Sequence, residues 1–128
     1  MKTDSFWKEV LETLFREFMQ FFFPKIYQDI DFGKGYQFLD KEFQQITKRS
    51  KSSKKIVDKL VKVYLKGGQE TWLLIHIEIQ GQKGTDFAQR MYMYNYRIFD
   101  KYQKEVISLA LLTDPDPNYL PNIYETRR

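Results

Sequence analysis

Two segments in the middle of the chain alternate between apolar and polar residues with the period of a β-strand. In a strand, neighbouring side chains point to opposite faces, so residues two positions apart share a face. Across Trp72 to Gln80 one face is mixed in character: Trp72, Leu74, His76, Glu78 and Gln80. The opposite face is aliphatic and is the predicted core face: Leu73, Ile75, Ile77 and Ile79. The earlier segment places Val57, Lys59, Val61, Val63 and Leu65 on one face, and Asp58, Leu60, Lys62 and Tyr64 on the other.

These two segments are expected to pair as a hairpin. Residues 66–70 join them, and the Gly67-Gly68 pair can adopt the positive φ angles that a tight turn requires. Side-by-side pairing would bring Asp58 near Glu78 on the neighbouring strand. The alternation leaves the pairing register open, so the sequence predicts that the two acids are close without specifying which residue lies directly opposite each.

Helical periodicity flanks the predicted hairpin. An apolar stripe predicts a helix from about Phe6 to Phe22 that ends before Pro24, with Trp7, Leu11, Leu14, Phe15, Phe18 and Phe22 inward. A second helix is predicted from about Phe87 to Tyr102, because Asp86 and Gln89 resemble a capping box. Its expected inward residues are Phe87, Met91, Tyr94, Ile98 and Tyr102.

The remaining segments complete a layered arrangement. Residues 29–35 read as a turn, and residues 36–46 as a strand, a helix, or one after the other. The apolar run from Val106 to Leu112 predicts a buried strand, and the tail after Asp114 is expected to be rich in turns. The order of helix, hairpin-linked strands, helix and strand predicts an α/β or α+β sandwich, in a single domain over residues 1–128.

Composition excludes several kinds of chemistry. The 128 residues include no cysteine and a single histidine, so a structural zinc site and a cysteine nucleophile are excluded. A Ser-His-Asp triad would need His76, which lies in mid-strand without a nucleophile-elbow motif and is expected to be packed or to line a site. No apolar run approaches the roughly 18 residues of a membrane span, and the N-terminus does not open a signal peptide. We therefore expect a soluble cytoplasmic protein without a membrane partner.

Positive charge is concentrated just ahead of the hairpin. The net charge is +4, and residues 48–55 contain five cations among serines: Lys48, Arg49, Lys51, Lys54 and Lys55. A basic segment that leads into Asp58 is suited to contacts with the phosphate backbone of a nucleic acid. The alternative is a solvated loop whose cations keep the protein soluble.

The two acids on neighbouring strands are a candidate cation site. At a separation of about 4 Å near a surface, two carboxylates repel by about 4 kcal/mol unless a cation bridges them or one pKa rises. Mg²⁺ suits the first arrangement, because it takes one or two carboxylates, keeps several waters and adds phosphate oxygens from a substrate. Asp58 and Glu78 are therefore predicted metal ligands. The alternative is that both are ordinary half-exposed strand residues.

Several stretches of the sequence resemble a known family. They are residues 21–24 (FFFP), 38–42 (FLDKE), 57–63 (VDKLVKV), 75–82 (IHIEIQGQ), 87–91 (FAQRM) and 94–100 (YNYRIFD). The sequence resembles the PD-(D/E)XK nucleases, and more closely their Rpn branch of recombination-promoting, transposase-like nucleases. The resemblance implies a restriction-endonuclease-like core of helix, three-stranded meander, helix and strand. It also implies a DNA endonuclease of a recombination or mobile-element type that uses Mg²⁺ or Mn²⁺, and the sequence leaves a homodimer open.

The resemblance assigns roles to individual residues. Asp58 and Glu78 take the positions of the metal-binding acids, and Gln80 stands where most superfamily members have lysine, a departure typical of this branch. Lysine offers a fixed charge near the attacking water and the phosphate, whereas glutamine can only orient them by hydrogen bonds. Arg90 is the expected substitute cation, with Lys62 as the alternative, and a structural salt bridge is the other role open to Arg90.

The first helix and the C-terminus add two further expectations. Glu17 lies at the border of the apolar stripe of the first helix, so it is an additional acid that could reach the site, and the alternative is an ordinary solvated residue. Relatives of this type continue past the segment that corresponds to Tyr119 to Arg128, so part of the domain is expected to be missing at the C-terminus. Two alternatives to an active enzyme therefore stay open: a catalytically impaired nucleic-acid-binding remnant, and an interaction domain without a nucleic-acid role.

Overall fold

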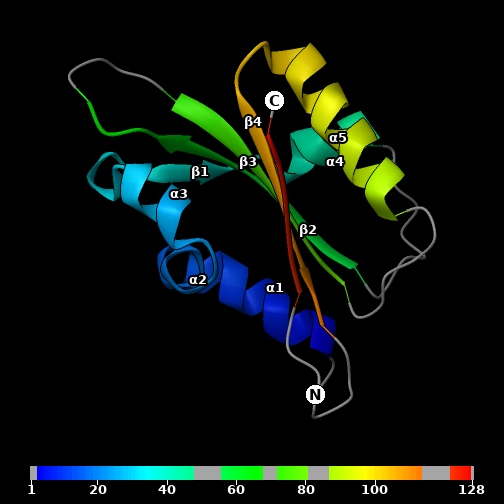
Figure 1. Ribbon diagram of the computed structural model, residues 1–128, viewed down its shortest axis with the longest axis horizontal. Coiled ribbons are helices and arrows are strands. Elements are labelled where there is room, and N and C mark those ends of the chain that lie inside the picture. Colours follow the sequence, from blue (N-terminus) through cyan, green and yellow to red (C-terminus); the bar gives the residue numbers. More distant parts are fainter. Residues whose placement is uncertain (1–2, 48–55, 68–71, 81–86, 114–121, 128) are drawn as a thin grey trace.

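A five-stranded mixed sheet forms the centre of the protein, in a computed structural model that describes residues 3–47, 56–67, 72–80, 87–113 and 122–127. The strands lie in the order of the chain (Figure 1): β1 (Tyr36–Phe38), β2 (Ile56–Tyr64), β3 (Trp72–Gln80), β4 (Val106–Leu112) and β5 (Asn122–Arg127). β1, β2 and β3 form an antiparallel meander, β4 runs parallel to β3, and β5 returns antiparallel to β4. The predicted mixed α/β class is therefore confirmed.

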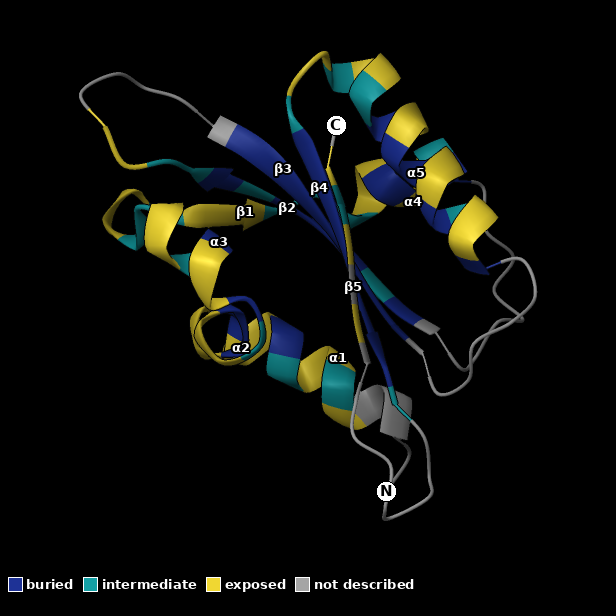
Figure 2. Cartoon of the chain, viewed as in Figure 1, coloured by how far each residue is buried: buried dark blue, intermediate teal, exposed yellow. Residues whose placement is uncertain are grey.

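Helices cover both faces of this sheet (Figures 1 and 2). One face carries α1 (Thr3–Thr13), α2 (Phe15–Phe22) and α3 (Pro24–Asp29), and the other carries α4 (Asp40–Thr47) and α5 (Phe87–Tyr102). The main apolar cluster lies beneath α1–α3 and includes Ile75, Ile77 and Ile79. On the α4–α5 face two smaller apolar clusters form, and His76 and Ser108 lie between them along β3 and β4.

The hairpin of β2 and β3 is confirmed, and its register is defined. Pairing runs without interruption from Ile56 opposite Gln80 to Tyr64 opposite Trp72. The aliphatic face of β3 is buried in the main core, as its alternation predicts. The other face, which carries the two candidate acids, therefore lies on the α4–α5 side of the sheet.

The N-terminal helix is broken, which corrects the prediction of one continuous helix over residues 6–22. α1 ends at Thr13, because Leu14 has φ −126° and ψ 36° and so leaves the helical region. The Thr13 hydroxyl donates to the Glu9 carbonyl at 2.7 Å, a local contact of the kind that bends helices. Leu14 is 47% exposed as a result, although the stripe placed it inward. Pro24 follows the end of α2 as predicted, and it also opens α3, where its missing N–H costs nothing.

Residues 36–47 form a strand followed by a helix, which is one of the three alternatives left open by the sequence. β1 and α4 follow a short 3-10 turn, η1 (Phe32–Lys34), whose Gly33 N–H donates to the Asp31 carboxylate at 3.0 Å. The predicted helix at 87–102 and the predicted strand at 106–112 are both confirmed, and every residue of that strand is buried.

The C-terminal tail contains a strand where the sequence predicts turns. β5 pairs with residues 107–112 of β4. Ile123 and Glu125 are both exposed, so this strand lacks the apolar alternation that marks a half-buried strand. It is held by main-chain hydrogen bonds to β4, which leave no pattern in the side chains. Arg127 adds an ion pair, since its Nε and Nη2 donate to the Glu105 carboxylate at 2.8 and 3.0 Å.

Some predicted features lie outside the described residues: the basic segment 48–55, Gly68 of the predicted turn, Asp86 of the capping box, and residues 114–121 of the tail. Within the described part of the chain, no helix is long and apolar enough to cross a membrane.

Candidate functional site

The two candidate acids are direct neighbours in the sheet. Asp58 on β2 lies opposite Glu78 on β3, and cross-strand neighbours of this kind hold their Cβ atoms about 5 Å apart. The predicted proximity of the two acids is therefore confirmed. Their surroundings differ, because Asp58 is half-buried and Glu78 is fully buried. Removing a carboxylate from water is costly, so Glu78 needs compensating partners.

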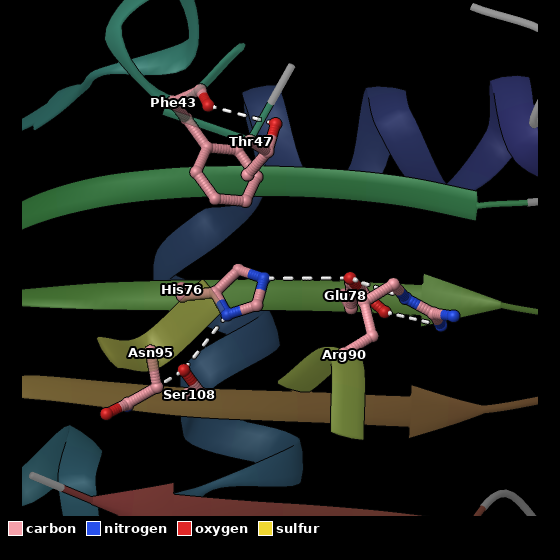
Figure 3. Close-up of polar contacts among 7 residues, drawn as sticks. All are labelled: Phe43, Thr47, His76, Glu78, Arg90, Asn95 and Ser108. Atoms are coloured by element: carbon pink, nitrogen blue, oxygen red, sulfur yellow. Dashed lines mark hydrogen bonds and ion pairs between the residues drawn. The ribbon is translucent and has the colours of Figure 1, made fainter. Parts of the chain in front are cut away.

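Arg90 supplies the first compensating partner (Figure 3). Its Nη2 lies 3.1 Å from Glu78 Oε2 and its Nε lies 3.5 Å from Oε1, so the guanidinium and the carboxylate meet along two contacts. The Arg90 side chain is 16% exposed, which leaves the pair largely desolvated. The ring of Phe87, one turn earlier on α5, lies 5.8 Å from Arg90 Cζ. Of the two roles open to Arg90, the salt bridge is present in the structure.

His76 lies on the same face, next to Glu78 along β3. Its Nε2 is 3.8 Å from Glu78 Oε1, and its side chain is fully buried. The rings of Phe43 from α4 and Tyr94 from α5 flank the imidazole, at centroid distances of 5.0 and 5.9 Å. His76 is therefore both packed and in contact with the site, the two roles expected for it.

The sequence pattern does not single out two further polar residues near His76. Ser108 on β4 and Asn95 on α5 are both buried. Ser108 Oγ is 2.9 Å from His76 Nδ1, and Asn95 Nδ2 is 3.0 Å from the same oxygen (Figure 3). The available signal was a lone hydroxyl in the otherwise apolar run 106–112 and a lone amide on the inward side of α5.

A second charged cluster lies on the opposite face of β2. The Lys59 Nζ is 2.8 Å from Asp40 Oδ2 and 3.7 Å from Glu12 Oε1. It also lies 5.4 Å from the centre of the Phe38 ring. The alternation places Lys59 on the core face, and its side chain is indeed only 6% exposed. Because Asp58 and Lys59 are successive strand residues, this cluster is separate from the Asp58–Glu78 pair.

Glu17 is not brought to the acids, which corrects its predicted place. It is exposed on α2, and α2 covers the other face of the sheet. Lys62 stands on the same face as Asp58 by alternation, and its Nζ lies 5.3 Å from the centre of the Tyr64 ring, toward the turn of the hairpin.

The backbone of Gln80 lies between Ile56 on β2 and Leu112 on β4. Alternation puts Gln80 on the face of Glu78, and its side chain lies outside the described residues. The five cations of the basic segment also lie outside them.

A surface cleft of about 210 Å³ opens elsewhere, between α3 and the turn end of the sheet. It is lined by Ile26, Gln28, Asp29, Leu65, Lys66, Leu73, Ile107 and Arg127. It therefore lies on the α1–α3 side and contains none of the predicted site residues.

The donor set of the acid pair fits Mg²⁺ or Mn²⁺. Carboxylate oxygens are the hard ligands that these ions prefer. Among the side chains that the structure describes, no group of three or more His, Cys, Asp or Glu is placed to hold an ion. Two carboxylates are enough for Mg²⁺, which keeps several waters and takes phosphate oxygens from a substrate. Arg90 competes for one of these two ligands.

The described residues define a mixed α/β protein whose central hairpin holds a pair of acids on the face that α4 and α5 cover. Comparison of the chain with protein-family models, with curated proteins and with solved structures finds no match. The geometry of the site is therefore the basis for a functional proposal.

Proposed function

We propose that this protein is a divalent-metal-dependent DNA endonuclease of the PD-(D/E)XK type. The observation that carries the proposal is the direct pairing of Asp58 with Glu78 on the α4–α5 face of the sheet. Carboxylates on directly opposed strand residues repel each other when they approach, and a cation bound between them offsets this repulsion. An arrangement of this kind is suited to phosphodiester chemistry, because phosphate oxygens can complete the coordination of the ion.

The order of elements supports the same proposal. The resemblance implies a core of helix, three-stranded meander, helix and strand. The chain has N-terminal helices, the meander β1–β2–β3, the helix α5 and then β4. The short helix α4 is an addition between β1 and β2.

Each site residue has a role in the proposed reaction. Asp58 and Glu78 would hold the ion. A bound Mg²⁺ or Mn²⁺ supplies an activated water and stabilises charge on the departing oxygen. Gln80 would orient the attacking water, since its amide can both donate and accept hydrogen bonds. An amide carries no charge, so Arg90 would provide the positive side-chain charge that a lysine provides in most superfamily members.

Arg90 has a second consequence for the site. Its guanidinium already occupies the Glu78 carboxylate at 3.1 Å, so Arg90 and a divalent ion compete for the same oxygens. A residue in this position keeps the buried Glu78 charge balanced when the ion is absent. Arg90 is therefore expected to weaken ion binding while supporting the fold.

The basic segment supports DNA as the substrate. Lys48, Arg49, Lys51, Lys54 and Lys55 precede β2 directly, and β2 carries Asp58. Cations that neutralise phosphates release counterions, so they add affinity that falls steeply with salt. The sequence pI near 9.2 favours the same partner.

Cleavage of supercoiled plasmid tests the proposal. We expect nicking that requires Mg²⁺ or Mn²⁺, stops on chelation, and is lost in Asp58→Ala and Glu78→Ala. Glu125→Ala is the matched control, because Glu125 is an exposed acid on β5 and its variant should cleave like the wild type. Circular dichroism of each variant separates loss of activity from loss of fold. Metal-independent nicking, or full activity in Asp58→Ala, contradicts the proposal.

A nucleic-acid-binding remnant is the second candidate. It is favoured by the Arg90–Glu78 ion pair, which neutralises one of the two ligands, together with Gln80 in the lysine position. DNA binding with a steep salt dependence, but no cleavage with any divalent ion, supports this candidate over the enzyme. A wild-type protein that neither binds nor cuts nucleic acid contradicts both.

A further inference from the structure

A chain of buried polar side chains crosses from α5 through β4 to β3 and ends at Glu78 (Figure 3). Asn95 Nδ2 lies 3.3 Å from the Val106 carbonyl and 3.0 Å from Ser108 Oγ. Ser108 Oγ lies 2.9 Å from His76 Nδ1, and His76 Nε2 lies 3.8 Å from Glu78 Oε1. Hydrogen bonds therefore connect the helix and the two strands as far as His76, and the imidazole faces the Glu78 carboxylate across 3.8 Å, beyond hydrogen-bond distance.

One set of hydrogen-bond directions is consistent with these contacts. The Val106 carbonyl can only accept, so the Asn95 atom that faces it is the NH₂ group, which donates to Ser108 Oγ with its other hydrogen. Ser108 Oγ can accept this hydrogen bond and donate its own hydrogen to His76 Nδ1, which is an acceptor in one of the two imidazole tautomers. In that tautomer the proton is on Nε2, the nitrogen that faces Glu78.

The surroundings hold this chain in one arrangement. His76, Glu78 and Ser108 are fully buried, and Asn95 is nearly so. Phe43 and Tyr94 close on the imidazole ring from two helices. A buried network of satisfied hydrogen bonds is rigid, so it holds the His76 ring in one orientation beside Glu78.

We propose that Asn95, Ser108 and His76 are positioning residues that fix the orientation of the Glu78 carboxylate for a divalent ion. The inference rests on the proposed function, because it concerns the same ligand. Partners that orient a metal ligand from behind raise ion affinity, and their removal weakens it about 10-fold to 100-fold.

Titration of the full-length protein with Mn²⁺ tests the inference, with free Mn²⁺ measured by its electron paramagnetic resonance signal. Ser108→Ala removes the central hydroxyl of the polar network, and we expect the Kd of this variant for Mn²⁺ to rise about 10-fold. Ile107→Val is the matched control, because it trims the next residue of β4 on the opposite, apolar face. It should lose stability without a change in Kd.

The outcomes separate the two proposals. If Ser108→Ala binds Mn²⁺ as the wild type does, the positioning role is wrong and the endonuclease proposal stands. If Ile107→Val weakens binding as much as Ser108→Ala, the effect is one of general stability and the positioning role is again wrong. If the wild type binds no Mn²⁺, the proposed function itself fails. Ser108→Cys keeps the volume with a weak hydrogen-bonding group, and it replaces Ser108→Ala in the same comparison if that variant does not fold.

Discussion

Arg90 and Glu78 form an ion pair between the start of α5 and β3, with Nη2 3.1 Å from Oε2. Glu78 is fully buried, so the guanidinium provides the positive charge that its carboxylate needs inside the protein. The same contact occupies oxygens that an ion would use. Stability and ion affinity should therefore depend on Arg90 in opposite directions.

Arg90→Met is expected to lower stability and to tighten ion binding. Methionine keeps much of the side-chain length but leaves Glu78 without its guanidinium, so the free energy of unfolding should fall by about 3 kcal/mol in urea denaturation. Loss of the competitor should lower the Kd for Mn²⁺, even in this less stable variant. Arg97→Met is the control, because Arg97 is exposed on the same helix and should change stability by less than about 0.5 kcal/mol. Unchanged stability, or weaker Mn²⁺ binding, in Arg90→Met contradicts the competition.

The Lys59–Asp40 pair should respond unequally to loss of either partner. The Lys59 side chain is 6% exposed, whereas the Asp40 side chain is 34% exposed. Asp40→Asn leaves a buried ammonium with a weaker partner, and the free energy of unfolding should fall by about 2 kcal/mol. Lys59→Met leaves a carboxylate on a side chain that is partly exposed, although its Oδ1 is buried, so the loss should be the smaller of the two, about 1 kcal/mol.

Urea denaturation of both variants checks this order. Glu12→Gln is the control, because Glu12 is the more distant partner of Lys59 at 3.7 Å and is itself 42% exposed. A larger loss in Lys59→Met than in Asp40→Asn contradicts the assignment of Lys59 as the more desolvated partner.

Tyr102 should make stability fall at high pH. Burial raises the pKa of the Tyr102 hydroxyl above its ordinary value of 10.0, and the nearby Glu42 carboxylate raises it further. Above pH 10 the unfolded chain loses this proton while the folded protein still keeps it, so the free energy of unfolding falls as the pH rises toward the higher pKa of the folded state. Below pH 10 the hydroxyl is protonated in both states and has no effect.

Ultraviolet difference titration of wild type against Tyr102→Phe isolates this group among the nine tyrosines. The difference spectrum should titrate above pH 10, and Glu42→Gln should move its midpoint down. A Tyr102 midpoint at or below 10 contradicts the assignment.

The basic segment should set the salt dependence of DNA binding. Each phosphate contact contributes about −0.9 to the slope of log K against log salt, so the double variant Lys54→Gln, Lys55→Gln should make the slope shallower by about 2. The slope is measured by fluorescence anisotropy of a labelled duplex over a range of salt concentrations. The pair Lys101→Gln, Lys104→Gln, exposed at the end of α5, is the control and should leave the slope unchanged. An unaltered slope in the Lys54, Lys55 variant removes the segment from the DNA interface.

The hairpin could be predicted because its signal is local. Alternation along residues 56–65 and 72–80 assigns every residue to a face, and Gly67-Gly68 marks the turn. The register could not be predicted, since a shift of two residues keeps the same faces. The opposition of Asp58 and Glu78 is therefore a result of the structure rather than of the pattern.

Arg90 could be named as a site residue from the resemblance, but the polar residues behind His76 could not, because they arrive from other elements. Asn95 comes from α5 and Ser108 from β4, and their contacts depend on how α5 packs across the sheet. The same reason explains β5, whose main-chain pairing leaves no apolar pattern. The break at Leu14 was missed for a different reason, since the apolar stripe continues through it while the backbone does not.

The register of β2 with β3 constrains how the sequence can change in length. Insertion or deletion of one residue inside either strand would turn Asp58 or Glu78 to the aliphatic face and bring an isoleucine or valine out of the core. Such a change would damage both the core and the acid pair at once. Residues can be added or removed at the turn around Gly67 without this effect, because the pairing of the strands is preserved there. Homologous sequences should therefore differ in the interval between the two acids through changes at the turn, and hardly ever through changes within the strands.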